Sequence, residues 1–97
     1  MSYELIARLA LIKALESKGM LRVGTYEPDQ VRCQTLLNRY LCAIVSFDKR
    51  SFAHAEVTSV GCRNNQWSAH VHVFSARGLF REFSMLVAGD VPPAVTP

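Results

Sequence analysis

Apolar residues recur with two different periods along this chain, and the change falls near residue 41. Before that point they recur every three or four positions, which is the spacing of one face of an α-helix. After it they recur every second position among β-branched and aromatic residues, as in strands with one buried face. The pattern therefore predicts helices in the first part of the chain and strands in the second.

Residues 3–18 have the strongest helical pattern and consist mostly of good helix formers. Ser2 can cap the amino end, and Gly19 can end the helix. At about 100° per residue, its apolar positions cover an arc of about 220°, which is wider than packing on one sheet requires. Either the next helix, together with Met20 and Leu21, covers the rest of this arc, or a second subunit does.

A second helix is predicted over residues 28–40. Pro28 suits the first helical position, and Asp29 is favourable beside the positive end of the helix dipole. The apolar face of this segment is weaker than that of the first helix and consists of Val31, Leu37, Tyr40 and Leu41. Residues 20–26, between the two helices, fit either a short strand or a connector.

Four strands are predicted from residue 41 onward, connected in order as an antiparallel meander. Asn64 and Asn65 tolerate left-handed backbone and suit the turn of a two-residue hairpin. Gly78 suits a three-residue loop between the last two strands, while Lys49 and Arg50 mark the first turn. The two later registers place one set of apolar side chains on a common face: Val60, Trp67, Ala69, Val71, Val73, Phe83 and Met85.

These elements predict an α+β fold in which two helices pack on one face of a four-stranded antiparallel sheet. Residues 1–88 form its single domain, and the Pro-rich residues 89–97 form a tail. One feature conflicts with this scheme, because alternation turns His54 and Glu56 to the apolar face, where unpaired polar groups are costly. A β-bulge near residues 53–55, or a position at the sheet edge, would resolve the conflict.

Composition indicates one small folded domain with more apolar surface than it can bury alone. Of its 97 residues, 49% are hydrophobic and 20% are charged, and the mean hydropathy is +0.10, which excludes wholesale disorder. A domain of this size has little interior. A homodimer or a protein partner would cover the remaining apolar surface.

The net charge of +3 and the sequence pI of about 9.0 are compatible with an anionic partner. The three cysteines, Cys33, Cys42 and Cys62, follow no metal-binding or redox spacing, and their odd number disfavours a disulfide framework. A reducing cytoplasm is therefore the expected location. Charged residues interrupt the amino-terminal apolar segment, so neither an export signal nor a membrane-spanning segment is expected.

His70, His72 and Glu82 are the candidate metal ligands. Strand periodicity places both imidazoles on one face, and the predicted hairpin brings the Glu82 carboxylate opposite His72. A cross-strand His–Glu pair on a solvated face explains the same pattern without a metal. The chain has no P-loop, GxGxxG, GxSxG, HExxH or EF-hand pattern. No cofactor and no catalytic residue is therefore predicted. A metal-dependent enzyme is a weaker hypothesis than protein binding or nucleic-acid binding, which are considered next.

The basic residues of two predicted turns meet at one end of the sheet: Lys49, Arg50, Arg77 and Arg81. Beside them the last hairpin pairs Phe74 with Phe80, so aromatic rings adjoin the cations. Such a rim can hold nucleic-acid phosphates and stack bases. Turns also collect solvated charge without any ligand, and no nucleic-acid-binding sequence motif is present.

The same face also fits a protein interface. Ile44, Ala55 and the two phenylalanines are expected to form an apolar band across an otherwise polar sheet, with Val57 beside His72. The sequence therefore favours a non-enzymatic module, an adaptor or inhibitor of the size that phages and other mobile elements often encode. It would bind a protein partner through Phe74, Phe80, Arg77, Arg81, Lys49 and Arg50. Nucleic-acid binding through the basic rim is the alternative.

Overall fold

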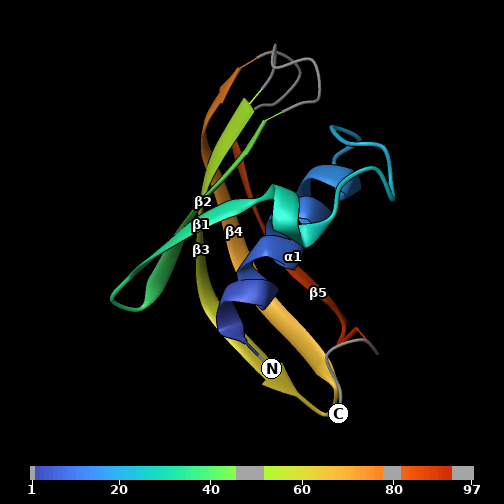
Figure 1. Cartoon of the computed structure of the whole chain (residues 1–97), viewed down its shortest axis with the longest axis vertical. Coiled ribbons are helices and arrows are strands. Elements are labelled where there is room, and N and C mark those ends of the chain that lie inside the picture. The colour runs from blue at the N-terminus through green and yellow to red at the C-terminus, as the bar shows by residue number, and fades with distance from the viewer. Residues whose placement is uncertain (1, 46–51, 78–81, 93–97) are drawn as a thin grey trace.

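The structure is a computed structural model that describes residues 2–45, 52–77 and 82–92, without the side chains of residues 52 and 75–77. Figure 1 shows α1 on one face of a strongly twisted five-stranded sheet whose strands follow chain order. The elements are α1 (Tyr3–Ser17), the 3₁₀ turn η1 (Pro28–Gln30), β1 (Arg32–Leu36), β2 (Arg39–Val45), β3 (Phe52–Arg63), β4 (Gln66–Arg77) and β5 (Phe83–Asp90). Neighbouring strands are antiparallel, so the predicted α+β class and antiparallel meander are confirmed.

The predicted second helix is wrong. Residues 28–30 form only the single turn η1. The chain then forms β1 and β2, which are connected by a two-residue turn. Val31, Cys33 and Thr35 are β-formers at alternate positions, and this period of two outweighs the favourable helix start. The sheet therefore has five strands rather than four, and the described part of the chain contains one α-helix.

Residues 20–26 form a connector and not a strand. α1 ends where Gly19 adopts a φ of 72°, a left-handed value that glycine tolerates. The Glu16 carboxylate then accepts a 3.0 Å hydrogen bond from the backbone N–H of Gly24, which ties the connector to the helix end. The Tyr26 hydroxyl donates to the Val45 carbonyl at 2.7 Å, so the connector also contacts the end of β2.

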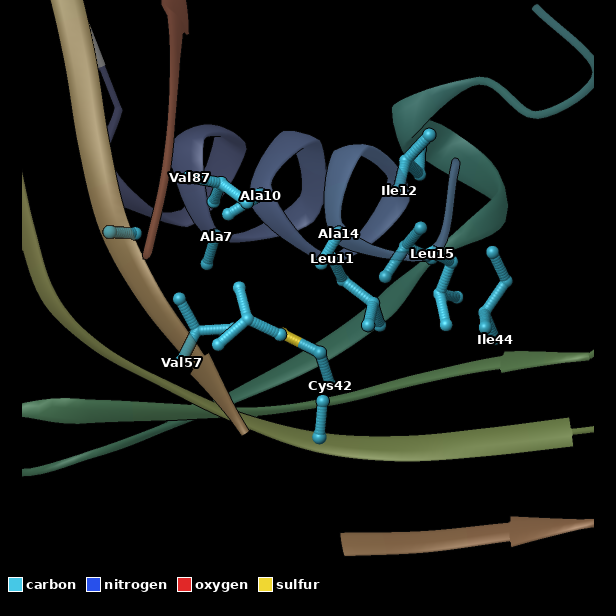
Figure 2. Close-up of a cluster of buried hydrophobic side chains, with 14 of the residues drawn as sticks. Ala7, Ala10, Leu11, Ile12, Ala14, Leu15, Cys42, Ile44, Val57 and Val87 are labelled. Atoms are coloured by element: carbon cyan, nitrogen blue, oxygen red, sulfur yellow. The ribbon is translucent and has the colours of Figure 1, made fainter. Parts of the chain in front are cut away.

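α1 begins at its predicted cap, where the Ser2 hydroxyl oxygen accepts a 3.4 Å hydrogen bond from the Leu5 N–H. Figure 2 shows its apolar side facing the sheet, with small alanines between larger side chains. The buried residues of α1 are Ile6, Ala7, Ala10, Leu11, Ile12, Ala14 and Leu15. The helix contacts all five strands and η1, so one chain covers most of its wide apolar arc, while Leu5 is half-buried.

The two faces of the sheet differ in what covers them. The helix face carries the core, to which the strands contribute Cys42, Ile44, Ala53, Ala55, Val57, Trp67, Ala69, Val71, Val73 and Val87. The opposite face, which we call the open face, carries the alternate residues of the same strands. Among residues 2–45, 52–77 and 82–92, no helix or second sheet packs on the open face.

A β-bulge in β3 decides which side chains reach the open face. The register of β3 and β4 shifts between Thr58 and Gly61, and Ser59 has a φ of 54° at this point. Before the bulge the odd-numbered residues of β3 face the helix, and after it the even-numbered residues do. His54 and Glu56 therefore lie on the open face, which resolves the conflict that the sequence poses at these two residues.

A second register shift lies between His54 and Ala55, inside the segment where the sequence predicts a bulge. The additional residue is Phe74 of β4, which has no direct partner in β3. The alternation of β3 continues unchanged through this point, since Ala53, Ala55 and Val57 are all buried on the helix face. The predicted bulge thus exists, but the one at Ser59 turns the two polar residues outward.

The two-residue hairpin at Asn64 and Asn65 is confirmed. These asparagines have φ values of 53° and 61°, and Cys62 pairs with Trp67 as predicted. Beyond the bulge the predicted pairs of β3 are wrong, because Thr58 lies opposite His70 rather than Val71. The bulge adds one residue to β3 only, and its local signal is Gly61, since an isolated glycine within a strand is typical of a bulge.

The register of β4 and β5 differs from the prediction by two residues, since Val71 lies opposite Met85 and not Phe83. A shift of two keeps every side chain on its face, so the predicted apolar face of these strands is preserved. β5 also includes Gly89 and Asp90, two residues that the sequence prediction counts with the tail. The predicted turn and loop at residues 49–50 and 76–78 lie wholly or partly outside the described residues.

Gly89 of β5 lies against the ring of Trp67, its cross-strand partner. A Cβ added at residue 89 would lie 2.7 Å from Trp67 Cζ2, and Trp67 is only 4% exposed, so the ring has little room to move. We expect Gly89→Ala to lower the free energy of unfolding by about 1–2 kcal/mol, because the ring or the strand must shift. Urea denaturation followed by tryptophan fluorescence measures this loss.

Gly61→Ala is the matched control, since a Cβ at this strand glycine meets no atom within 4 Å. We expect it to change the free energy of unfolding by less than about 0.5 kcal/mol. Equal losses in the two variants would contradict the close contact between Gly89 and Trp67.

Candidate interaction surface

Large apolar side chains lie on the open face, which no element of the described residues covers. Leu86 of β5 is 75% exposed, and Phe74 of β4 is 43% exposed. Leu41 and Ala43 of β2 are half-buried on the same face. Polar residues lie between them: His54, Glu56, Thr58, His70, His72 and Ser84. Exposed apolar side chains with polar neighbours are typical of a surface that binds another protein.

A shallow hollow of about 330 Å³ lies on the open face between β1, β2, β3 and β4. Leu41, Ala43 and Phe74 supply apolar lining to it. Arg32 and His54 line it as well, so a cation adjoins the apolar part. A hollow of this shape can receive one side chain of a partner, which is how interface anchors are usually seated.

Polar contacts organise the surroundings of this hollow. Arg39 Nη1 lies 3.2 Å from Glu56 Oε2, and His72 Nε2 lies 3.5 Å from Glu82 Oε1. The His72 and Phe74 rings meet edge to face with their centroids 6.1 Å apart, which supports the exposed Phe74 ring. Within the described ranges Arg32 has no ion-pair partner, so its charge is available to a ligand.

Only Phe74 of the six predicted partner-binding residues is described with its side chain, and it lies on the open face as predicted. Arg77 is the last residue of β4, and its side chain is outside the description. Phe80, Arg81, Lys49 and Arg50 lie outside the described residues. The pair of phenylalanines and the basic rim are therefore untested, and nucleic-acid binding through that rim stays a prediction.

The predicted apolar band is wrong at three of its members. Ile44, Ala55 and Val57 lie on the helix face, each at most 1% exposed. The alternate residues of β2, including Leu41, take their place on the open face. Leu41 and Leu86 were missed by the sequence prediction. Alternation with Phe83 and Met85 does assign Leu86 to the open face, whereas Leu41 was missed because Ile44 was assigned to that face.

The three candidate metal ligands do not converge. His72 lies opposite Ser84, and Glu82 reaches it only diagonally at 3.5 Å. His70 lies opposite Leu86, further along the strand. In the parts of the chain that the structure describes, no three His, Cys, Asp or Glu side chains are grouped so that they could hold a metal ion. His72 and Glu82 form a solvated pair, with side chains 42% and 70% exposed.

Cys33 and Cys42 form a disulfide bond between β1 and β2, contrary to the expectation from the cysteine count. They lie directly opposite each other in a non-hydrogen-bonded pair, where antiparallel strands approach most closely, and their Cα atoms are 4.1 Å apart. Cys62 is exposed and carries a free thiol. The cytoplasmic location was inferred from unpaired cysteines, so this bond removes its main support.

No helix in the described residues is long and apolar enough to cross a membrane. No known protein family, characterised protein or solved structure matches this chain. The geometry of the open face therefore indicates what the protein can bind.

Proposed function

We propose that this protein is a non-enzymatic interaction module, an adaptor or inhibitor that binds a partner protein through the open face of its sheet. The observation that carries the proposal is the uncovered set of apolar side chains around the hollow, with Phe74 43% exposed beside it. The proposed binding surface also includes the other residues that the sequence predicts to bind a partner: Phe80, Arg77, Arg81, Lys49 and Arg50.

The exposed apolar residues are not explained by the needs of folding. The core forms on the helix face, where the apolar strand residues are buried or pack partly buried against it. Leu86 and Phe74 contribute little to that core, and each exposes apolar area to water at a cost in free energy. Burial against a second protein recovers this free energy, which supports binding as the role of the face.

The lining of the hollow indicates the chemistry of the partner. An apolar side chain of the partner can enter beside Phe74 and Leu41, where it displaces water from apolar surface. Arg32 offers a planar guanidinium that can form a bidentate bond with a carboxylate. We therefore expect an acidic partner surface that presents an aromatic or aliphatic anchor, in agreement with the net charge of +3.

Site-specific photo-crosslinking in cells tests the proposal. Benzoylphenylalanine at residue 41 is expected to capture a defined partner, while the same group at Lys13, on the exposed side of α1, captures none. The purified partner should then lose at least about tenfold in affinity to the variant Phe74→Glu, because a charge enters the apolar contact.

Lys13→Glu provides the matched control for Phe74→Glu, since it also introduces a carboxylate but on the opposite side of the molecule. Its affinity for the same partner should equal that of the wild type. Cross-links of equal yield from both positions, or full affinity in Phe74→Glu, would refute binding through the open face.

A further inference from the structure

Among residues 2–45, 52–77 and 82–92, β5 is an edge strand, and no strand of this part of the chain pairs with the backbone groups on its outer side. Val91 donates its backbone N–H to the Asn65 carbonyl at 2.9 Å, which fixes the odd-numbered residues as those bonded toward β4. In an antiparallel ladder the alternate residues point their N–H and C=O groups the other way. Ser84, Leu86 and Ala88 therefore direct these groups outward from the sheet.

This edge lacks the features that usually protect edge strands. Natural edges carry lysine or proline, or are short. β5 has eight residues, with neither charge nor proline from Phe83 to Gly89. The other edge strand, β1, has only five residues, begins with Arg32 and is tied to β2 by the disulfide. β5 is therefore the edge that can accept another strand.

We propose that β5 pairs antiparallel with β5 of a second copy of this chain, around a two-fold axis at Leu86. In this register Leu86 lies opposite Leu86 of the second copy, so its 75% exposed side chain gains an apolar neighbour. Ser84 lies opposite Ala88 on the same face. On the helix face Met85 lies opposite Val87. All facing side chains from Ser84 to Ala88 are small or apolar, so the strand is complementary to itself.

The ends of the paired segment limit its length. Glu82 of one copy lies opposite Asp90 of the other in this register, and like charges at opposite positions repel. The dimer therefore depends on the central residues and dissociates on dilution. Both open faces lie on the same side of the joined sheet, because Leu86 of each copy belongs to that face. This interface goes beyond the proposed function, since no residue of β5 lines the hollow, although Leu86 also belongs to the open face.

Analytical ultracentrifugation over a concentration series tests the pairing. The wild type should approach twice the 10.8 kDa mass of the chain as its concentration rises. Ala88→Pro removes an outward N–H and blocks the edge without breaking a bond to β4, so its dimer dissociation constant should rise at least about tenfold. Thr35→Pro is the matched control, because Thr35 is an outward position of the opposite edge and should leave dimerisation unchanged.

Two further variants keep the proposal falsifiable if a proline disturbs folding. Leu86→Lys places like charges at the two-fold axis and should also raise the dissociation constant at least about tenfold. Glu82→Lys replaces the repulsion with Asp90 by attraction and should lower it by about threefold. Far-UV circular dichroism verifies that each variant is folded.

A monomeric wild type at every soluble concentration would overturn the pairing, as would unchanged dimers in Ala88→Pro and Leu86→Lys. An unchanged or weaker dimer in Glu82→Lys would overturn the register. Cross-linking from residue 41 in the Ala88→Pro background tests the open face separately, because this variant retains Phe74 and the hollow.

Discussion

Replacement of Leu11 by alanine is expected to lower the free energy of unfolding by about 3–5 kcal/mol, the range for a fully buried leucine. Leu11 is 0% exposed in the middle of α1 and lies between the helix and the sheet (Figure 2). Ala7, Ala10 and Ala14 beside it are too short to fill the cavity, and Leu15, one turn further along α1, is itself 0% exposed and packed in the core. Urea denaturation measured by circular dichroism gives the loss.

Leu86→Ala, measured at a dilution at which the chain is monomeric, is the control for this substitution, because the same atoms are removed from a side chain that is 75% exposed. Its free energy of unfolding should change by less than about 0.5 kcal/mol. A loss below about 1 kcal/mol in Leu11→Ala would contradict the packing of α1 across the sheet. The comparison also separates residues that hold the fold together from residues that are available for binding.

The sequence predicted α1 and the hairpin between β3 and β4 correctly, because interactions between neighbouring residues determine both. α1 has a cap at Ser2, strong helix formers and a glycine at its end, and each of these is used as predicted. The hairpin between β3 and β4 was predicted because Asn64 and Asn65 tolerate positive φ. Both elements carry their signal in adjacent residues.

The hairpin of β1 and β2 carries no such signal. Its turn places Leu37 at a φ of 50°, a conformation for which glycine or asparagine would be expected. Leu37 is also 101% exposed, whereas the helix prediction used it as part of an apolar face. Because residue 37 is a leucine, the sequence does not indicate a turn here. Pro28 instead favours a helix, but the pairing of β1 with β2 outweighs this local preference.

The candidate surface was predicted only where the alternation of β4 is regular. Phe74 was placed correctly, because the apolar face of β4 was identified from a long alternating segment. Errors began in β3, where the bulge at Ser59 reverses the two faces. Gly61 signals an irregularity near this point, but a bulge depends on how two strands pair, so the glycine alone does not show which residue is additional. The apolar band was consequently assigned to Ile44 instead of Leu41.

Reduction of the bond between Cys33 and Cys42 is expected to lower the free energy of unfolding by about 2.5 kcal/mol, because the unfolded chain regains the entropy of an open loop. The two cysteines are nine positions apart, so the loop is short and the effect is moderate. For a domain of this size the melting temperature should fall by about 10–20 °C. Thermal unfolding by circular dichroism with and without dithiothreitol measures this change.

Cys33→Ser should melt without reductant at the temperature of the reduced wild type, since it removes the bond and alters only a half-buried side chain. Cys62→Ser is the matched control, because it replaces a cysteine that takes no part in the bond and should match the wild type under both conditions. Titration of unfolded protein should find one reactive thiol before reduction and three after it. Three thiols in oxidised wild type would contradict the bond.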